Sequence, residues 1–538
     1  MIKKFFYYIL TVAFLTASIA CWQLLFSFSE EADTFFVMNL GRYVLEHGIP
    51  YVDPFTIHEN LKLVAQQWLS GIFFWEAYKN FGVNGLKFID FIASAAMILI
   101  YWRMCLFVSG GNKILSFVMA FVFGILTGPS SVPRPHILST PLLVAEVFML
   151  EKFTRTNNAK FLIPLLPISM LIINLHAAVW LMTLVLCVPF LFVKNIRHAK
   201  FLTAAMVGIF LCGLINPYGL DAMTYVFRSY GLEIINEHIQ EMFAPNAHDF
   251  SGKIFYLFEA LMIFTLTKFK LPWRYIFLSG GIIFMALMHT RNILLFYFIA
   301  TMPAAYALKD FSAEKFLSGK ILPKVVFLLP LTANTAMVTM TLQEGLDKLS
   351  LPFQILFGLT TLFMLYTLLI VRCEGLILHK KILPKKILAL SVTAIIACGI
   401  YAMTLSGNKT KFNETYTEAI KFILRSEQPE NISLYIAQGG GGIAGNLGVR
   451  YYIDSRSEVF IKANNGQKDI FQEYLDFVTG KLNYKDFFNR YKFTHIIITG
   501  ANPFILELMS NDKNFRVIYE SERVNRYDVI RCKIFVPR

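Results

Sequence analysis

Long apolar stretches recur along most of the chain and then stop. A helix needs about 20 apolar residues to cross the hydrocarbon core of a bilayer, and runs close to this length follow one another from Phe5 to Leu405. They predict about thirteen membrane-spanning helices, near residues 5–28, 84–108, 113–128, 137–151, 161–176, 177–193, 200–216, 253–268, 273–289, 292–308, 324–342, 352–371 and 386–406. The pattern indicates a polytopic α-helical membrane protein.

The connections between these runs alternate in charge. Lys and Arg gather at the N-terminus and in every second connection, for example around residues 152–160 and 372–386, whereas most acids lie in the others. Basic connections stay on the cytoplasmic side of the cell membrane. The first apolar run lacks an Ala-x-Ala cleavage site and is interpreted as an uncleaved span. We therefore expect a cytoplasmic N-terminus and, with an odd number of spans, an extracytoplasmic C-terminus.

A different pattern follows the last span. Residues 1–408 are expected to form the transmembrane domain, and residues 409–538 a small, separate extracytoplasmic α/β domain, because predicted strands and helices alternate there. The predicted helices cover 413–427, 468–478, 484–491 and 502–511, and the strands cover 432–437, 451–454, 494–499, 515–520 and 527–535. Gly439–Gly442 is interpreted as a flexible turn, since the Lys-Ser/Thr of a phosphate-binding loop is missing. Asp454 and Arg456 are expected to form an ion pair at a turn.

Two outer connections, residues 29–83 and 217–252, are long. The first contains helical patterns at 32–46 and 67–79, and both are rich in aromatic residues, His and acids. Connections of this length in compact proteins are usually functional or disordered. Their composition argues against disorder, so we expect function there.

Composition supports a membrane protein and argues against a nucleic-acid partner. Hydrophobic residues make up 56% of the 538 residues and charged residues 16%, against about 25% charged residues in soluble proteins. The net charge of +14 lies in the short connections between spans, as expected for membrane orientation. No CxxC or CxxH spacing occurs, which argues against a zinc site or a disulfide framework.

Charged residues at three places on the predicted outer face suggest chemistry. Asp33 and Glu31 follow the first span; Asp33 suits a helix N-cap, a general base or a metal ligand. Arg134 is the one basic residue of its outer loop and is flanked by prolines. It could bind a phosphate or extend toward lipid headgroups. Arg291 is the sole basic residue of another outer turn, where a charged group is a functional candidate.

The remaining candidates share the predicted outer face. Several have structural alternatives: a turn for Asp53, an interfacial anchor for Trp68 and a helix-ending corner for Asn216. Their joint placement predicts one extracytoplasmic site. The set comprises Asp53, His58, Trp68, His136, Asn174, His176, Asn216, Tyr218, Glu237 and His289.

These motifs carry a resemblance to known membrane proteins. An acid soon after the first span, a large first outer loop and many further spans resemble the GT-C glycosyltransferases, which include protein O-mannosyltransferases, the aminoarabinose transferase for lipid A and oligosaccharyltransferases. The chain also resembles a group of uncharacterised bacterial membrane proteins over most of residues 29–310 and part of the tail. The shared motifs are Asp33-Thr34-Phe35-Phe36, residues 48–56, Gln67-Trp68-Leu69, Arg134-Pro135, Asn174-Leu175-His176, Asn216-Pro217-Tyr218-Gly219 and residues 452–456.

The resemblance implies an enzyme that moves a sugar from a polyprenyl-phosphate donor to a glycan, lipid or protein acceptor. In GT-C enzymes the acid of the first loop acts as base or binds a divalent metal. Asp33 matches that acid by position, but Thr34 replaces the usual second acid, so Glu31 remains an alternative. No cofactor is expected; metal independence is preferred, with a divalent metal left open.

The other site residues divide into two expected groups. Arg134 and Arg291, with His136 and His289, are expected to bind the donor phosphate. The substrate pocket is expected to hold Asp53, His58, Trp68, Asn174, His176, Asn216, Tyr218 and Glu237.

Two other function classes stay open. A transporter or flippase of lipid-linked glycans would need a polar path through the bilayer, but the mid-span acids Asp90, Glu146 and Glu259 form no series. A non-catalytic scaffold for envelope assembly would use the C-terminal domain for binding.

Overall fold

A computed structural model describes residues 11–12, 15–16, 32–126, 132–192, 196–228, 232–310, 411–524 and 529–538. The spans predicted near 5–28, 324–342, 352–371 and 386–406 lie mainly or wholly outside these residues. Glu31 does as well.

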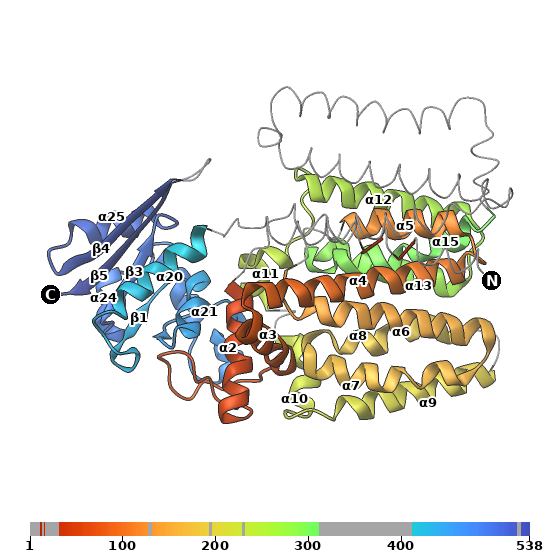
Figure 1. Cartoon of the computed structure of the whole chain (residues 1–538), viewed down its shortest axis with the longest axis horizontal. Coiled ribbons are helices and arrows are strands. Elements are labelled where there is room, and N and C mark those ends of the chain that lie inside the picture. The colour runs from red at the N-terminus through yellow and green to blue at the C-terminus, as the bar shows by residue number, and fades with distance from the viewer. Residues whose placement is uncertain are drawn as a thin grey trace, which may run out of the picture.

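A bundle of helices forms the larger part of the described chain (Figure 1). The helices coincide with predicted apolar runs and are α4 (Val83–Val108), α5 (Lys113–Leu126), α6 (His136–Thr156), α7 (Leu165–Leu175), α9 (Ile196–Gly213), α12 (Phe250–Lys268) and α13 (Trp273–Met288). Buried apolar side chains between them, such as Tyr101, Phe153 and Trp180, make one continuous core. Two of the described helices, α4 and α9, are by length and composition apolar enough to cross a membrane.

Two predicted spans are interrupted. Between 177 and 193, α8 (Leu181–Val185) lies between two 3₁₀ turns, and Pro189 is the second residue of the later turn (Val188–Leu191). Between 292 and 308, α14 (Ile293–Leu295) leads through a π-helical turn into α15 (Met302–Ala307), where Pro303 lies in the first turn. Proline lacks a backbone N–H and cannot continue the α-helical hydrogen-bond ladder. The number of about thirteen spans stays a prediction.

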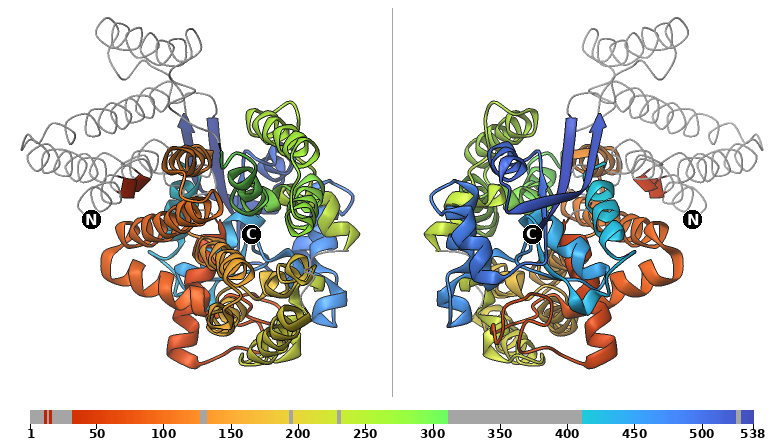
Figure 2. Two further views of the ribbon diagram at one scale, coloured as in Figure 1. Left: turned by 90° about the vertical axis from the view of Figure 1, so that its right-hand side faces the viewer. Right: turned by 90° about the vertical axis from the view of Figure 1, so that its left-hand side faces the viewer.

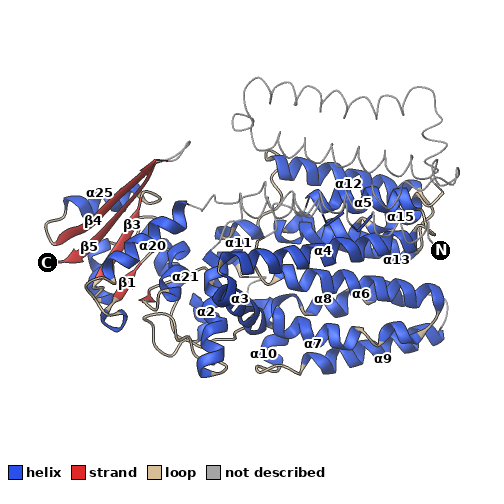
Figure 3. Ribbon diagram, in the orientation of Figure 1, coloured by secondary structure: helices blue, strands red, loops and turns tan. Residues whose placement is uncertain are grey.

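The C-terminal residues form a five-stranded mixed sheet at one end of the bundle (Figure 3). The strand order is β2-β1-β3-β5-β4; β1 pairs in parallel with β2 and β3, and β5 is antiparallel to β3 and β4. The strands are β1 (Ser433–Tyr435), β2 (Arg450–Tyr451), β3 (His495–Thr499), β4 (Phe515–Val524) and β5 (Val529–Pro537). The main helices are α20 (Lys411–Ile423), α21 (Gln438–Asn446), α23 (Ile470–Val478), α24 (Tyr484–Tyr491) and α25 (Pro503–Asn511). The helix α21 was not predicted. The other four helices and all five strands overlap the predicted ones, although β2 shares only Tyr451 with the strand predicted at 451–454.

The prediction of a turn at Gly439–Gly442 is wrong, because these residues begin α21. This helix packs against α2 (Ala32–His47), in the segment 29–83 that the sequence predicts to be the first outer loop and that keeps this name below. A Cβ atom on Gly442 would lie 2.6 Å from the carbonyl oxygen of Ala32, so the two backbones approach too closely for a larger residue. The side-chain amide of Asn39 donates a hydrogen bond to the Gly442 carbonyl at 2.8 Å. The glycine run makes a helix–helix contact.

Both outer loops share hydrophobic cores with the C-terminal sheet. Thr56 forms a parallel bridge with Tyr451, which extends the sheet beyond β2 by a segment of the first loop. Phe36 on α2 belongs to the same buried cluster as residues of β1, α20 and α21. Leu61 and Met242 pack into the aromatic core of the C-terminal unit. Parts of the outer loops, including α2, therefore lie between the C-terminal sheet and the bundle (Figure 1). In the right-hand view of Figure 2, the C-terminal unit faces the viewer in front of the bundle.

Candidate functional site

Four charged residues from separate segments form a chain of ion pairs. One guanidinium nitrogen of Arg134 lies 3.0 Å from a carboxylate oxygen of Asp33, and another contacts Glu241. Arg291 approaches the second oxygen of Glu241 at 4.0 Å. The side chains keep between 24% and 41% of their exposure, so solvent or a ligand can reach them. Asp33, Arg134 and Arg291 thus belong to one site.

Backbone contacts hold this chain in place. The hydroxyl of Thr34 donates a hydrogen bond to the carbonyl of Pro133, which joins the first turn of α2 to the loop that carries Arg134. The ring Nδ1 of His289 bonds the carbonyl of Met242 at 2.6 Å, and the Thr290 hydroxyl donates to the carbonyl of Glu241. His289 therefore links the turn of Arg291 to the segment of Glu241.

Glu241 is the acid that sequence reasoning did not select. Burial opposes its negative charge, but Arg134 and Arg291 outweigh that effect, so its pKa lies below the usual value. The signal available in the sequence was its place in the same outer loop as Glu237. Glu237 is exposed on the short helix α11 (Glu233–His238) and is not one of the four paired residues.

Two histidines lie beside the ion-pair chain. His136 begins α6 and is close enough to Glu241 and His176 to interact with both electrostatically. The Nδ1 of His176 shares a hydrogen bond with the Ser139 hydroxyl at 3.1 Å, and its side chain is buried. The two rings therefore lie near the ion-pair chain, one at the start of α6 and the other just after α7.

Trp68, in the first outer loop, and Asn174, at the end of α7, are joined by a hydrogen bond. The indole N–H of Trp68, at the start of α3 (Trp68–Phe81), donates to the side-chain oxygen of Asn174 at 3.1 Å. The Asn174 amide also donates to the carbonyl of Ile215, near the end of α9. These bonds fasten α3 to the bundle.

Asn216 and Tyr218 form a corner after α9. The Asn216 side chain bonds the carbonyls of Gly213 and Gly219 and accepts from the backbone N–H of Tyr218. The Tyr218 hydroxyl donates to the carbonyl of Pro50 at 2.6 Å. The contacts are those of a structural corner that also holds the first outer loop.

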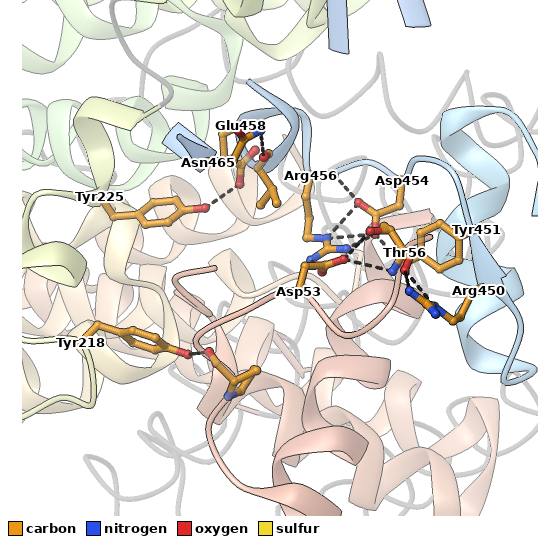
Figure 4. Close-up of polar contacts among 12 residues, drawn as sticks. Asp53, Thr56, Tyr218, Tyr225, Arg450, Tyr451, Asp454, Arg456, Glu458 and Asn465 are labelled. Carbon is orange, nitrogen blue, oxygen red and sulfur yellow. Dashed lines mark hydrogen bonds and ion pairs between the residues drawn. The ribbon is translucent and has the colours of Figure 1, made fainter. Parts of the chain in front are cut away.

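A second charged cluster is fully buried between the first outer loop and the C-terminal unit (Figure 4). The Arg456 guanidinium lies 2.5 Å from Asp53 and 2.6 Å from Asp454, and both aspartate side chains have no solvent exposure. Asp454 also accepts a hydrogen bond from the Tyr451 hydroxyl. Burial opposes the charge of Arg456, but the two aspartates outweigh it and its pKa lies above the usual value. The expected Asp454–Arg456 ion pair is confirmed, with Asp53 as a further partner.

His58 packs against the C-terminal unit. Its Nε2–H donates to the carbonyl of Tyr452 at 2.8 Å, and its ring contacts those of Tyr452, Phe460 and Tyr491. Burial lowers the pKa of His58 to about 4, against partial opposition from the Tyr452 hydrogen bond and Asp53. The ring is therefore neutral at physiological pH.

Among the described residues, no group of three or more His, Cys, Asp and Glu side chains could hold a metal ion. Within those residues, the acids nearest the candidate site, Asp33 and Glu241, are bridged by an arginine.

Comparisons with known proteins bear on the fold. The sequence matches no model of a known protein family and no curated protein. ArnT from Cupriavidus metallidurans in the apo state matches with a TM-score of 0.50 and 11% identity, over 97% of each chain. The apo oligosaccharyltransferase of Archaeoglobus fulgidus matches with a TM-score of 0.50 and 13% identity, over 91% of this chain and 69% of that one. A structure of the same ArnT bound to undecaprenyl phosphate has a TM-score of 0.48 at 11% identity, over 98% of this chain and 96% of that one.

The chain has the GT-C fold. The match extends over nearly the whole chain, so the fold includes the C-terminal unit as well as the bundle. With this fold and its apolar composition, the chain is a membrane protein. In the GT-C fold of this chain, the four-residue ion-pair chain lies where the first outer loop meets the bundle.

Proposed function

We propose that the chain is a membrane glycosyltransferase that moves a sugar from a polyprenyl-phosphate donor to an acceptor at the extracytoplasmic face. The observation that carries the proposal is the placement of Arg134, which lies 3.0 Å from Asp33 and also contacts Glu241. Arg291 approaches the same Glu241 carboxylate. Asp33 supplies a carboxylate base beside Arg134, and Glu241 holds Arg291 close to the same arginine, so a base and a phosphate site lie together. The GT-C fold supports the reaction class.

The arginines suit the charge that develops in the reaction. When a sugar leaves its phosphate, negative charge grows on the bridging oxygen, and preformed guanidinium donors stabilise it. In the structure both guanidinium groups face carboxylates. A phosphate that binds Arg134 would replace one of these contacts, because both anions use the same planar donors.

Asp33 has the geometry of a general base. Its carboxylate is one-third exposed, at the first turn of α2, where an acceptor hydroxyl can reach it. Once Arg134 turns to the donor phosphate, the carboxylate is free to accept the hydroxyl proton. Glu241 holds the two arginines beside one another through its contacts with both.

A transfer assay with purified protein and radiolabelled polyprenyl-phosphate sugars tests the proposal. Asp33→Asn should lower the single-turnover rate by about 10²–10⁴-fold while donor binding is kept. Arg134→Ala should also weaken donor binding, by roughly tenfold to a hundredfold, since it removes a charge-assisted hydrogen bond. Lys62→Ala is the control, because Lys62 makes an exposed outer ion pair with Asp221.

Full turnover by Asp33→Asn would remove Asp33 from the mechanism and leave Glu31 as the next candidate. The helix α2 begins at Ala32, so Asp33 lies in its first turn and not at the N-cap. If Asp33 only stabilises that turn, the variant should lose about 0.3–1 kcal/mol of stability and keep its turnover. Thermal stability and single-turnover rate measured on one preparation separate these outcomes. Donor binding without transfer to any acceptor would favour a transporter of lipid-linked glycans.

A further inference from the structure

Arg456 of the C-terminal unit contacts the helix that carries Asp33. Its guanidinium carbon lies 4.3 Å from the centre of the Phe36 ring on α2. Residues three positions apart are neighbours on one face of a helix, so Phe36 lies next to Asp33 along α2. The rings of Phe55 and Phe460 lie 5.4 Å and 5.7 Å from the same guanidinium. The cation is enclosed by aromatic rings from the first outer loop and the C-terminal unit.

The ion pairs of Arg456 fix this position. Asp454 receives two guanidinium nitrogens, and Asp53, which lies 403 residues away in the sequence, receives a third. Asp53 also accepts from the backbone and hydroxyl of Thr56, which pairs with Tyr451 of β2. All three guanidinium nitrogens are held in this way, so the Arg456 plane that packs on the Phe36 ring is fixed.

A second contact holds the same helix. The amide of Asn39 donates to the Gly442 carbonyl, and Arg42 donates to the carbonyls of Gly445 and Asn446. All three acceptors lie on α21. The C-terminal unit therefore contacts α2 at Phe36, Asn39 and Arg42, on successive turns of the helix that follow Asp33.

We propose that Arg456 is a positioning residue for Asp33, so that the C-terminal unit completes the catalytic site by fixing the first turn of α2. This inference rests on the proposed function for the role of Asp33. Arg456 touches neither donor nor acceptor in this scheme. It acts through Phe36 and Asp53.

Arg456→Lys tests the proposal, because Lys keeps the charge and loses the planar fork and the stacking surface. The single-turnover rate should fall by about tenfold to a hundredfold, the size of effect that follows a displacement of about 1 Å in a catalytic group. The dissociation constant of a polyprenyl-phosphate sugar should stay unchanged, since Arg134 and Arg291 are untouched. Arg490→Lys is the matched control, because Arg490 is an exposed arginine of the same unit, paired with Glu473.

Hydrogen–deuterium exchange on the full chain gives a readout independent of activity. In Arg456→Lys, amides 32–38 should exchange faster, whereas those of α23 should exchange as in the wild type. Faster exchange in both regions would mark a general loss of folding and would overturn the proposal. An unchanged rate or unchanged exchange at 32–38 would overturn it as well.

A second variant covers the case in which Arg456→Lys does not fold. Phe36→Leu keeps an apolar side chain and removes the ring under the guanidinium. Its single-turnover rate should also fall, while its dissociation constant for the donor should stay unchanged. If the wild type transfers no sugar, the proposed function fails. The exchange comparison still decides whether Arg456 orders the first turn of α2.

Discussion

Gly442 and Gly439 offer a matched pair of substitutions on α21. A Cβ atom on Gly439 would meet no atom within 4 Å, whereas one on Gly442 would lie 2.6 Å from the Ala32 oxygen and 3.1 Å from the Phe36 nitrogen. Both obstacles are backbone atoms of α2, so no side chain can rotate away. To restore ordinary contact, the two helices must separate by about 0.8 Å.

The two variants should differ in stability. Alanine in place of a helical glycine stabilises by up to about 1 kcal/mol, so Gly439→Ala should be neutral or slightly stabilising. Overpacking costs about 1–3 kcal/mol, so Gly442→Ala should be destabilising. The propensity gain is common to both variants, and their difference isolates the contact between α2 and α21.

Hydrogen exchange measures this difference locally. A loss of about 1–3 kcal/mol should speed exchange of α21 amides, and of the first turn of α2, by roughly fivefold to 150-fold. Because Ala32 precedes Asp33, the single-turnover rate should fall in Gly442→Ala and stay normal in Gly439→Ala. Equal exchange in the two variants would refute the helix–helix contact.

Three further predictions follow from individual residues. The pKa of His58 falls from 6.5 to about 4 on folding, so the unfolded chain binds the extra proton and stability should decrease as pH falls from 6.5 to 4. The loss of folding free energy should reach about 3 kcal/mol. Melting temperatures measured across this pH range should fall with pH in the wild type and change less in His58→Gln. The pKa of Glu241 lies below 4.5, so the contribution of its ion pairs to folding stability should be full above that pH and be lost as pH falls through the lowered pKa. The melting temperature of Glu241→Gln should depend less on pH in that window. Lys481→Cys, exposed on the C-terminal unit, should label from outside intact cells in a cysteine-depleted background; labelling only after permeabilisation would contradict the topology.

Local pattern was enough to place most elements. The β-branched run that becomes β3 and the amphipathic stretch that becomes α24 were predicted to within a residue or so, because strand and helix periods are visible over a few positions. The prediction of a turn at Gly439–Gly442 was wrong for a definite reason. Glycine lowers helix propensity, but the close approach of α2 outweighs propensity, and the sequence does not show which helix will approach.

The sequence by itself determined the class of protein and the composition of its outer face. Apolar runs, alternating basic connections and the acids, histidines and arginines of the outer loops are all local features. They brought Asp33, Arg134 and Arg291 forward as candidates. No periodicity relates these residues to one another.

Only the tertiary structure decided which charges meet. Arg134 lies between Asp33 and Glu241, not Glu237, because the turn of His289 holds the Glu241 segment beside it. Arg456 pairs with Asp53 across 403 residues because the first outer loop joins the edge of the C-terminal sheet. Burial of a charge requires an exact partner, and that partner is set by where distant segments pack, which local sequence does not encode.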